Sequence, residues 1–188
     1  MLRYHPLAVA IALVIAGCSP SSGDAAPAAT DVPSTTTATE ASAMEITSPA
    51  FEHGNPIPLK YSCDGENVSP LLDIADAPTE TAVLVLIMDD PDAPGGTWDH
   101  WIAYDIPPTE SIGEGDHTIG TGGLNSWKQT GYGGPCPPSG VHRYFFKLFA
   151  LDSELGLAGS ATKAAVLDAM EGHVIADATL MGTFTFDE

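Results

Sequence analysis

Apolar segments separated by short turns rich in glycine and proline run through most of the chain, a pattern that favours strands over helices. Residues 82–90 are a continuous apolar run with several β-branched side chains, which predicts a strand buried on both faces. The other strands expected from this pattern are residues 57–62, 100–107, 141–151 and 173–186.

One segment, residues 160–172, predicts a helix. Ser160 is its expected N-cap, Leu167 and Met170 lie three positions apart, and Gly172 is its expected stop. Residues 108–140 are rich in glycine and proline and predict a long ordered loop, which in a compact domain is usually functional. Because strands dominate, we expect a mostly β fold, a β-sandwich with one or two short peripheral helices.

The N-terminal residues 1–17 have the pattern of a signal peptide, with Arg3 before an apolar run that is shorter than a typical membrane span. The residues before Cys18 resemble a bacterial lipobox, in which that cysteine is lipidated after cleavage; an ordinary signal peptide with an incidental cysteine is the alternative. Ser19, the residue after this cysteine, resembles the pattern that sorts Gram-negative lipoproteins to the outer membrane. We therefore expect a lipid-anchored envelope protein that faces the periplasm, with the outer membrane as the favoured location.

Residues 18–43 follow as a segment of Ala, Ser, Thr and Pro with one large apolar residue, Val32. Such a composition buries too little surface to offset the entropy of ordering, so we expect a disordered linker. The folded domain is expected to span residues 44–188.

Charge and composition narrow the possible partners. The 188 residues carry a formal net charge of −19, with 44% hydrophobic residues. The hydrophobic content suits a folded domain, whereas the acidity excludes a basic footprint for nucleic acid and electrostatic attraction to anionic membranes. Membrane association is therefore expected through a lipid anchor only.

Beyond Cys18, the chain has Cys63 and Cys136. In an exported protein such a pair commonly forms a disulfide, and two buried free thiols are the alternative. Cofactor and enzyme motifs are absent from the sequence: it contains no GxSxG, HExxH or phosphate-binding GxxxxGK[ST]. His100, His142, Asp90 and Asp92 could bind a metal, but no pair of them has the spacing of metal ligands, so we expect no metal. Because these motifs are absent, we also expect no cofactor and no enzyme activity.

Two polar clusters lie at the ends of predicted strands. Asp90 and Asp92 end one strand, His100 begins the next, and His142 and Tyr144 begin a third. If these strands are neighbours, the side chains converge at one rim. Taken singly, the aspartates are explained as turn caps, Trp98 and Trp101 as packing residues, and the histidines and Tyr144 as buried structural groups.

Together, the clusters resemble the signature regions of the phosphatidylethanolamine-binding protein family, and of its bacterial Raf-kinase-inhibitor-like branch. The first region reads DPDAP at residues 90–94 with WDH at residues 98–100, and the second reads GPCPP at residues 134–138 with HRY at residues 142–144. The resemblance covers about residues 44–186. It implies a β-sandwich with a small pocket for phosphate, acetate or a phospholipid head group, formed by Asp90, Asp92, Trp98, His100, Gly134, Pro138, His142 and Tyr144.

Cys136 replaces the second glycine of the family's G-x-G, and a bond to Cys63 would fix the pocket loop. In the expected pocket, His100 and His142 donate to the anion together with backbone N–H groups of Gly133 and Gly134. An aspartate accepts from an ammonium group. A non-catalytic anion-binding lipoprotein is the favoured function; the alternatives are an interaction module that inhibits a protease or signalling protein and, less favoured, an acid–base hydrolase.

Overall fold

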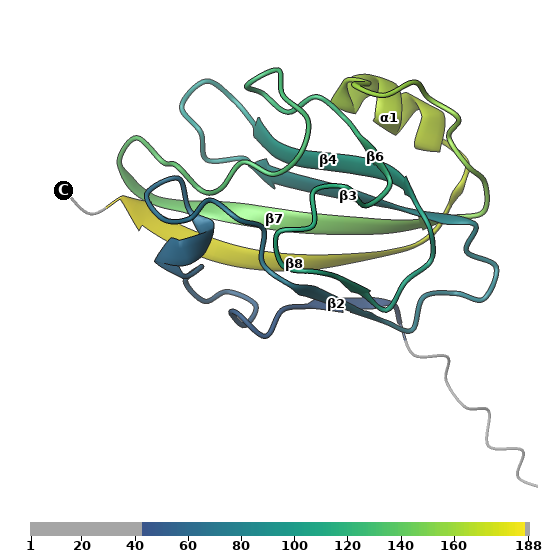
Figure 1. Ribbon diagram of the computed structural model, residues 1–188, viewed down its shortest axis with the longest axis horizontal. Helices are drawn as coiled ribbons and strands as arrows, with labels where there is room; N and C mark the ends of the chain where they lie inside the picture. The colour runs from purple at the N-terminus through teal and green to yellow at the C-terminus, as the bar shows by residue number, and fades with distance from the viewer. Residues whose placement is uncertain (1–42, 187–188) are drawn as a thin grey trace, which may run out of the picture. The chain divides into compact units, whose positions relative to one another are not determined.

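The computed structural model describes residues 43–186, so the predicted signal peptide, Cys18 and almost all of the predicted linker lie outside the described residues. The larger sheet has five antiparallel strands in the order β6-β4-β3-β7-β8 (Figure 1). Its strands are β3 (Val83–Asp90), β4 (Trp98–Ile106), β6 (Thr121–Gly122), β7 (Gly140–Leu151) and β8 (Val174–Phe186).

A smaller antiparallel sheet, in the order β1-β2-β5, covers one face of the larger one. Its strands are β1 (Glu45–Thr47), β2 (Leu72–Ala75) and β5 (Ser111–Ile112). Residues of both sheets, such as Leu72 and Leu86, belong to one buried cluster between the sheets. This arrangement confirms the predicted mostly β sandwich.

The central strand β3 is buried along its entire length, as predicted for residues 82–90. Alternate side chains of a strand point to opposite faces. Leu84, Leu86 and Met88 face the smaller sheet, whereas Val83, Val85 and Ile87 pack in a second cluster with Val166 and Met170 of α1 (Lys163–Met170). Burial of each such side chain contributes about 1.5–3 kcal/mol, so both layers stabilise the strand that positions Asp90.

The helix forms as predicted but starts later. Its N-cap is Thr162, whose side chain accepts a hydrogen bond from the N–H of Ala165, while Ser160 lies outside the helix with a φ of 67°. The predicted Ser160 cap is therefore wrong. Val166 and Met170, four residues apart, face the sheet together, which leaves Leu167 exposed.

Residues 57–62 do not form the predicted strand; they contain a short 3-10 helix, η1 (Leu59–Tyr61). Pro56 and Pro58 lack the N–H groups that a strand donates to its neighbours, which explains the difference. The strands near residues 100–107, 141–151 and 173–186 are confirmed. The predicted loop, residues 108–140, is mostly irregular but contributes β5 and β6 to the two sheets. Within the described residues, no helix combines the length and apolar character needed to span a membrane.

Candidate functional site

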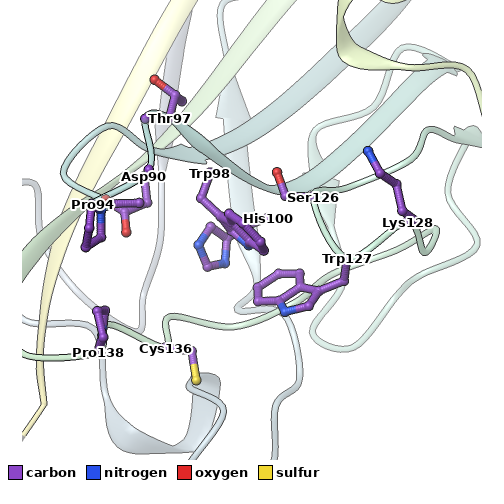
Figure 2. Close-up of a pocket in the computed structure, with 13 residues that line it drawn as sticks. Asp90, Pro94, Thr97, Trp98, His100, Ser126, Trp127, Lys128, Cys136 and Pro138 are labelled. Atoms are coloured by element: carbon purple, nitrogen blue, oxygen red, sulfur yellow. The ribbon is translucent and has the colours of Figure 1, made fainter.

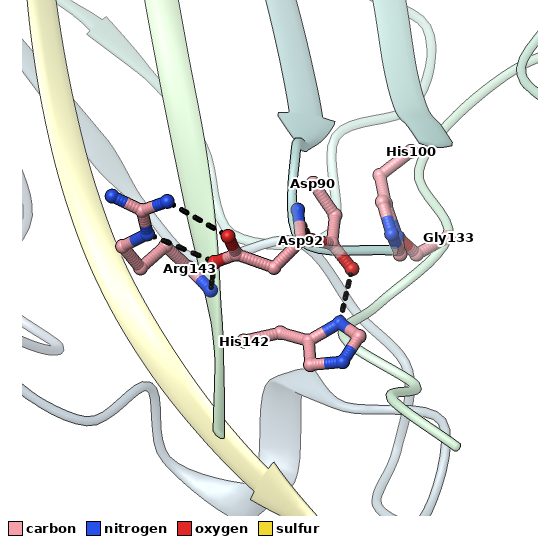
Figure 3. Close-up of polar contacts among 6 residues, drawn as sticks. All are labelled: Asp90, Asp92, His100, Gly133, His142 and Arg143. Atoms are coloured by element: carbon pink, nitrogen blue, oxygen red, sulfur yellow. Dashed lines mark hydrogen bonds and ion pairs between the residues drawn. The ribbon is translucent and has the colours of Figure 1, made fainter. Parts of the chain in front are cut away.

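Three neighbouring strands of the larger sheet, β4, β3 and β7, have one end each on the same side of the sheet, and we call this side the strand edge. Asp90, the last residue of β3, is paired in register with Trp98, the first residue of β4. Strand β7 is antiparallel to β3 and begins at the same edge. Asp90, His100 and His142, far apart in the sequence, therefore lie close together, as Figure 3 shows.

A β-bulge sets the direction of the His100 side chain. The pairing of β3 with β4 shifts between Met88 and Asp89, whose partners are Trp101 and Asp99, so His100 is an extra residue without a partner. A bulge re-aims the side chain that it carries. The ring of His100 lies 5.2 Å from that of Tyr144, in an edge-to-face arrangement.

Asp90 forms a buried pair with His142. The Nδ1 of His142 lies 2.7 Å from Oδ2 of Asp90, and both side chains are almost fully buried. The other carboxylate oxygen accepts a 2.8 Å hydrogen bond from the N–H of Asp92. Asp90 thus caps the turn after β3, as the simpler interpretation of the sequence held, and also fixes the orientation of the His142 ring.

His100 directs one nitrogen to the protein and keeps the other available. Its Nδ1 lies 2.7 Å from the carbonyl oxygen of Gly133, so Nδ1 carries the proton, and Nε2 has no hydrogen-bond partner among the described residues. Burial lowers the pKa of His100, while the nearby backbone of Gly133 and Gly134 and the charge of Asp90 act to raise it. The neutral ring presents Nε2 as an acceptor; protonation converts it into a donor.

Tyr144 lies fully buried next to His100, and its hydroxyl has no hydrogen-bond partner within residues 43–186. Burial raises the pKa of Tyr144 and the negative charge of Asp90 raises it further, while the nearby backbone of Cys136 acts to lower it. An unsatisfied buried hydroxyl costs about 1–3 kcal/mol. By contrast, the buried Tyr132 hydroxyl donates to the carbonyl of Tyr61 at 2.7 Å.

An open pocket of about 540 Å³ lies at this edge (Figure 2). Its volume falls within the range of sites for small organic ligands. It is lined by Asp90, residues 93–97, Trp98, His100, residues 126–128, Cys136 and Pro138.

The predicted site residues therefore occupy different positions. Asp90, Trp98, His100 and Pro138 line the pocket, and His142 and Tyr144 are not among its lining residues but lie behind Asp90 and His100. Their roles in binding stay predictions, and His142 reaches the pocket only through Asp90.

Asp92 is turned away from the pocket. Its carboxylate forms a two-pronged ion pair with Arg143, at 2.8 Å from Nε and 2.7 Å from Nη2, and also accepts the N–H of Arg143. The hydrogen bonds from Arg143 lower the pKa of Asp92 to about 2. This pairing fixes the turn after β3 to the start of β7.

The backbone donors expected from the glycine-rich loop are already used. The N–H of Gly134 donates to Oδ1 of Asn67 at 2.7 Å, and the N–H of Gly133 donates to the carbonyl of His100 at 3.0 Å. A side chain at Gly134 would clash, because its Cβ would lie 2.3 Å from the carbonyl oxygen of Tyr61. This glycine permits close packing and donates no hydrogen bond into the pocket.

The pocket also contains residues that the sequence reasoning missed: Ser126, Trp127 and Lys128. Trp127 packs edge-to-face on His100 at 5.0 Å and on Trp98 at 5.4 Å. The only signal in the sequence was that these residues belong to the long loop predicted to be functional. The sequence does not indicate which cavity a lysine or tryptophan of such a loop lines.

Cys63 and Cys136 form a disulfide, with their Cα atoms 5.4 Å apart, so the alternative of two buried free thiols is wrong. The bond joins positions separated by 73 residues. In the chain-entropy model, closing a loop of this length stabilises the fold by about 4 kcal/mol. It fixes the loop that carries Pro138 to the segment after η1. Within residues 43–186, no group of three metal-binding side chains is arranged to hold a metal ion.

The fold and site define a class: a small β-sandwich with a polar pocket where the central strands end. A family model described as phosphatidylethanolamine-binding protein matches residues 47–185. The chain belongs to this family.

A UPF0098 protein of Chlamydia trachomatis is 47% identical over 150 residues, which cover 77% of this chain and 100% of that protein. One of Methanothermobacter thermautotrophicus is also 47% identical, over 75% of this chain and 98% of the relative.

Solved structures agree. A Chlamydia trachomatis protein, described as a putative phosphatidylethanolamine-binding protein homologue, is 46% identical with a TM-score of 0.75, covering 77% of this chain and 99% of that one. Escherichia coli YbcL, described as a new member of the mammalian family, is 26% identical with a TM-score of 0.72, covering 78% of this chain and 100% of that one.

Proposed function

We propose that the pocket binds a small ligand through a phosphate or carboxylate group, such as a phospholipid head group carries, and performs no reaction on it. The observation that carries the proposal is that two polar groups have no hydrogen-bond partner within residues 43–186 and lie at the same ends of the strands: Nε2 of His100, in the pocket wall, and the buried hydroxyl of Tyr144 behind it. The family description, phosphatidylethanolamine-binding protein, points to ligands of the same chemistry.

The surroundings of these groups suit an anion. The Tyr144 hydroxyl is a donor, and protonated His100 adds a second donor with a positive charge. Asp90 would repel an anion, but each of its carboxylate oxygens already accepts an N–H, from His142 and from the backbone of Asp92. These hydrogen bonds disperse its charge and reduce the repulsion.

A binding role without catalysis is supported by the hydrogen bonds of the two histidines. Each has a protein partner for Nδ1, a carbonyl or a carboxylate. Among the described residues, neither histidine is hydrogen-bonded to a serine, threonine or cysteine, which is the arrangement that activates a nucleophile.

We also propose that the domain is held at the cell envelope through a lipid on Cys18, facing the periplasm. Support for this comes from the sequence: an apolar leader that ends in small residues before Cys18, and a polar linker after it. The disulfide suits an oxidising compartment of this kind.

Two tyrosine variants test the pocket. Tyr144→Phe removes the unpartnered hydroxyl, so we expect about tenfold weaker binding of inorganic phosphate and no loss of stability. Tyr132→Phe is the matched control: it leaves the carbonyl of Tyr61 unpaired, so stability should fall by about 1–3 kcal/mol while affinity is unchanged. Isothermal titration calorimetry and urea unfolding of the full chain measure both quantities.

Equal phosphate affinity in the wild type and Tyr144→Phe would contradict the role of the hydroxyl. If the wild type bound neither phosphate, acetate nor phosphoethanolamine, the pocket proposal would fail. The protein-interaction module would then become the leading function.

A further inference from the structure

Lys128 differs from the other basic residues that the structure describes. Lys60, Arg143, Lys147 and Lys163 each form an ion pair with aspartate or glutamate. Lys128 forms none with any residue from 43 to 186, and it lines the pocket. Its ammonium group is therefore available to a ligand.

The turn that carries Lys128 is both strained and firmly held. Lys128 has a φ of 63°, in the left-handed region, which costs a residue with a Cβ roughly 1–2 kcal/mol. The buried Asn125 holds the turn, because its Oδ1 accepts the N–H groups of Trp127 and Gln129. The N–H of Lys128 in turn donates to the carbonyl of Asn125. Strain held in place by its surroundings is typical of ligand-binding positions.

The pocket has two ends with an aromatic wall between them. Figure 2 shows Asp90 and Pro138 on one side, Lys128 on the other, and Trp98, His100 and Trp127 between. Asp90 is the one carboxylate among the lining residues. At the Lys128 end, the Oγ of Ser126 accepts the N–H of Asp99, so the Ser126 hydroxyl proton remains free to donate.

We propose that Lys128 is a specificity-determining residue that binds a second anionic group of the ligand, so the preferred ligands carry a phosphate, an ammonium and a carboxylate, as phosphoserine does. The phosphate lies beside His100 and the carboxylate pairs with Lys128. The ammonium lies between them against Trp98 and Trp127, whose rings attract cations. This inference rests on the proposed function and extends it to a class of ligand.

Calorimetry with three soluble compounds tests the proposal on the full chain: inorganic phosphate, phosphoethanolamine and O-phosphoserine. Phosphoethanolamine differs from O-phosphoserine only by the missing carboxylate. We expect the wild type to bind O-phosphoserine about tenfold more tightly than phosphoethanolamine. Lys128→Gln should abolish this preference and bind the two compounds equally.

Lys60→Gln is the matched control, because it removes the same charge from a surface pair with Glu114 outside the pocket. This variant should keep the preference. Equal affinities in the wild type, or a preference that persists in Lys128→Gln, would overturn the inference while leaving phosphate binding intact. If no compound bound the wild type, the inference and the proposed function would fail together.

Vesicles distinguish a lipid source from a free one. Phosphatidylserine and phosphatidylglycerol vesicles carry the same net charge per lipid, but only phosphatidylserine has the ammonium and carboxylate. Any lipid anchor contributes equally to both. If the wild type prefers phosphatidylserine vesicles and Lys128→Gln loses this preference, the ligand is a membrane lipid. If the wild type binds both kinds of vesicle equally but prefers O-phosphoserine to phosphoethanolamine in calorimetry, the ligand is a free phosphoserine-like compound.

Discussion

Three neighbouring aspartates show how the surroundings of a residue decide its role. Asp89 faces the α1 side of the sheet and pairs with Lys147 and Lys163, while Asp90 faces the opposite side and lines the pocket. Asp92 lies beyond the strand and binds Arg143. The alternation of a strand separates the first two. The single histidine among the residues that line the pocket is His100.

The affinity for an anion should depend on pH through His100. Its pKa is lowered from the ordinary value of 6.5 by burial, so the ring is neutral at pH 7 and Nε2 is an acceptor. An anion favours the protonated ring and raises its pKa, so binding takes up a proton. Affinity should therefore rise as the pH falls from 7 through the lowered pKa, and level off below it.

Sulfate is a suitable probe because it stays fully ionised across this range. Calorimetric titrations at a series of pH values measure the effect, and His100→Gln should flatten the profile. Sulfate affinity that increased toward higher pH would show that His100 does not supply the proton.

At the scale of elements, a cluster of charges around the buried Asp89 joins α1 to the strand ends that form the site. Lys163 of α1 lies 2.7 Å from Oδ2 of Asp89 and 2.6 Å from Oδ1 of Asp99, and Lys147 of β7 lies 2.8 Å from Asp89. Burial lowers the pKa of Lys163, but the hydrogen bonds to the two carboxylates outweigh it and raise the pKa overall. The helix therefore holds β3 and β4 in place on the side of the sheet opposite the pocket.

Replacing Lys163 by methionine should lower the free energy of unfolding by about 2 kcal/mol. The buried Asp89 then loses one of its two partners; Lys147 remains, so the loss is smaller than for an isolated buried pair. Lys60→Met, which breaks a surface pair, should change stability little. Urea unfolding measures both, and equal effects of the two substitutions would show that the cluster around Asp89 contributes no more than a surface pair.

At the scale of the whole molecule, the net charge of −19 has a consequence for membrane attachment. Anionic lipids repel such a chain, so the proposed attachment would depend on the lipid on Cys18 and not on electrostatic attraction. We expect the wild-type chain in the membrane fraction of Gram-negative bacterial cells and Cys18→Ser in the soluble fraction. A Cys18→Ser protein that stayed in the membrane fraction, or a wild type that never entered it, would contradict the proposed anchor.

The sequence was most informative where one local pattern sufficed. The apolar run at residues 82–90 predicted the central strand, since a strand covered on both faces needs apolar side chains at every position. The strands that the sequence did not predict depend on distant partners. The short strands β1, β2 and β5 carry little pattern of their own, because they form through pairing with one another and packing on the larger sheet.

The sequence by itself determined the fold class, the family resemblance and the candidate residues Asp90, Trp98, His100 and Pro138 of the pocket wall. Only the tertiary structure decided that His142 lies behind Asp90 and that Asp92 faces Arg143. It also decided that Lys128 lines the cavity. The physical reason is that residue type and spacing define a strand and its turn, whereas the direction of a side chain depends on bulges, strained turns and partners contributed by distant segments.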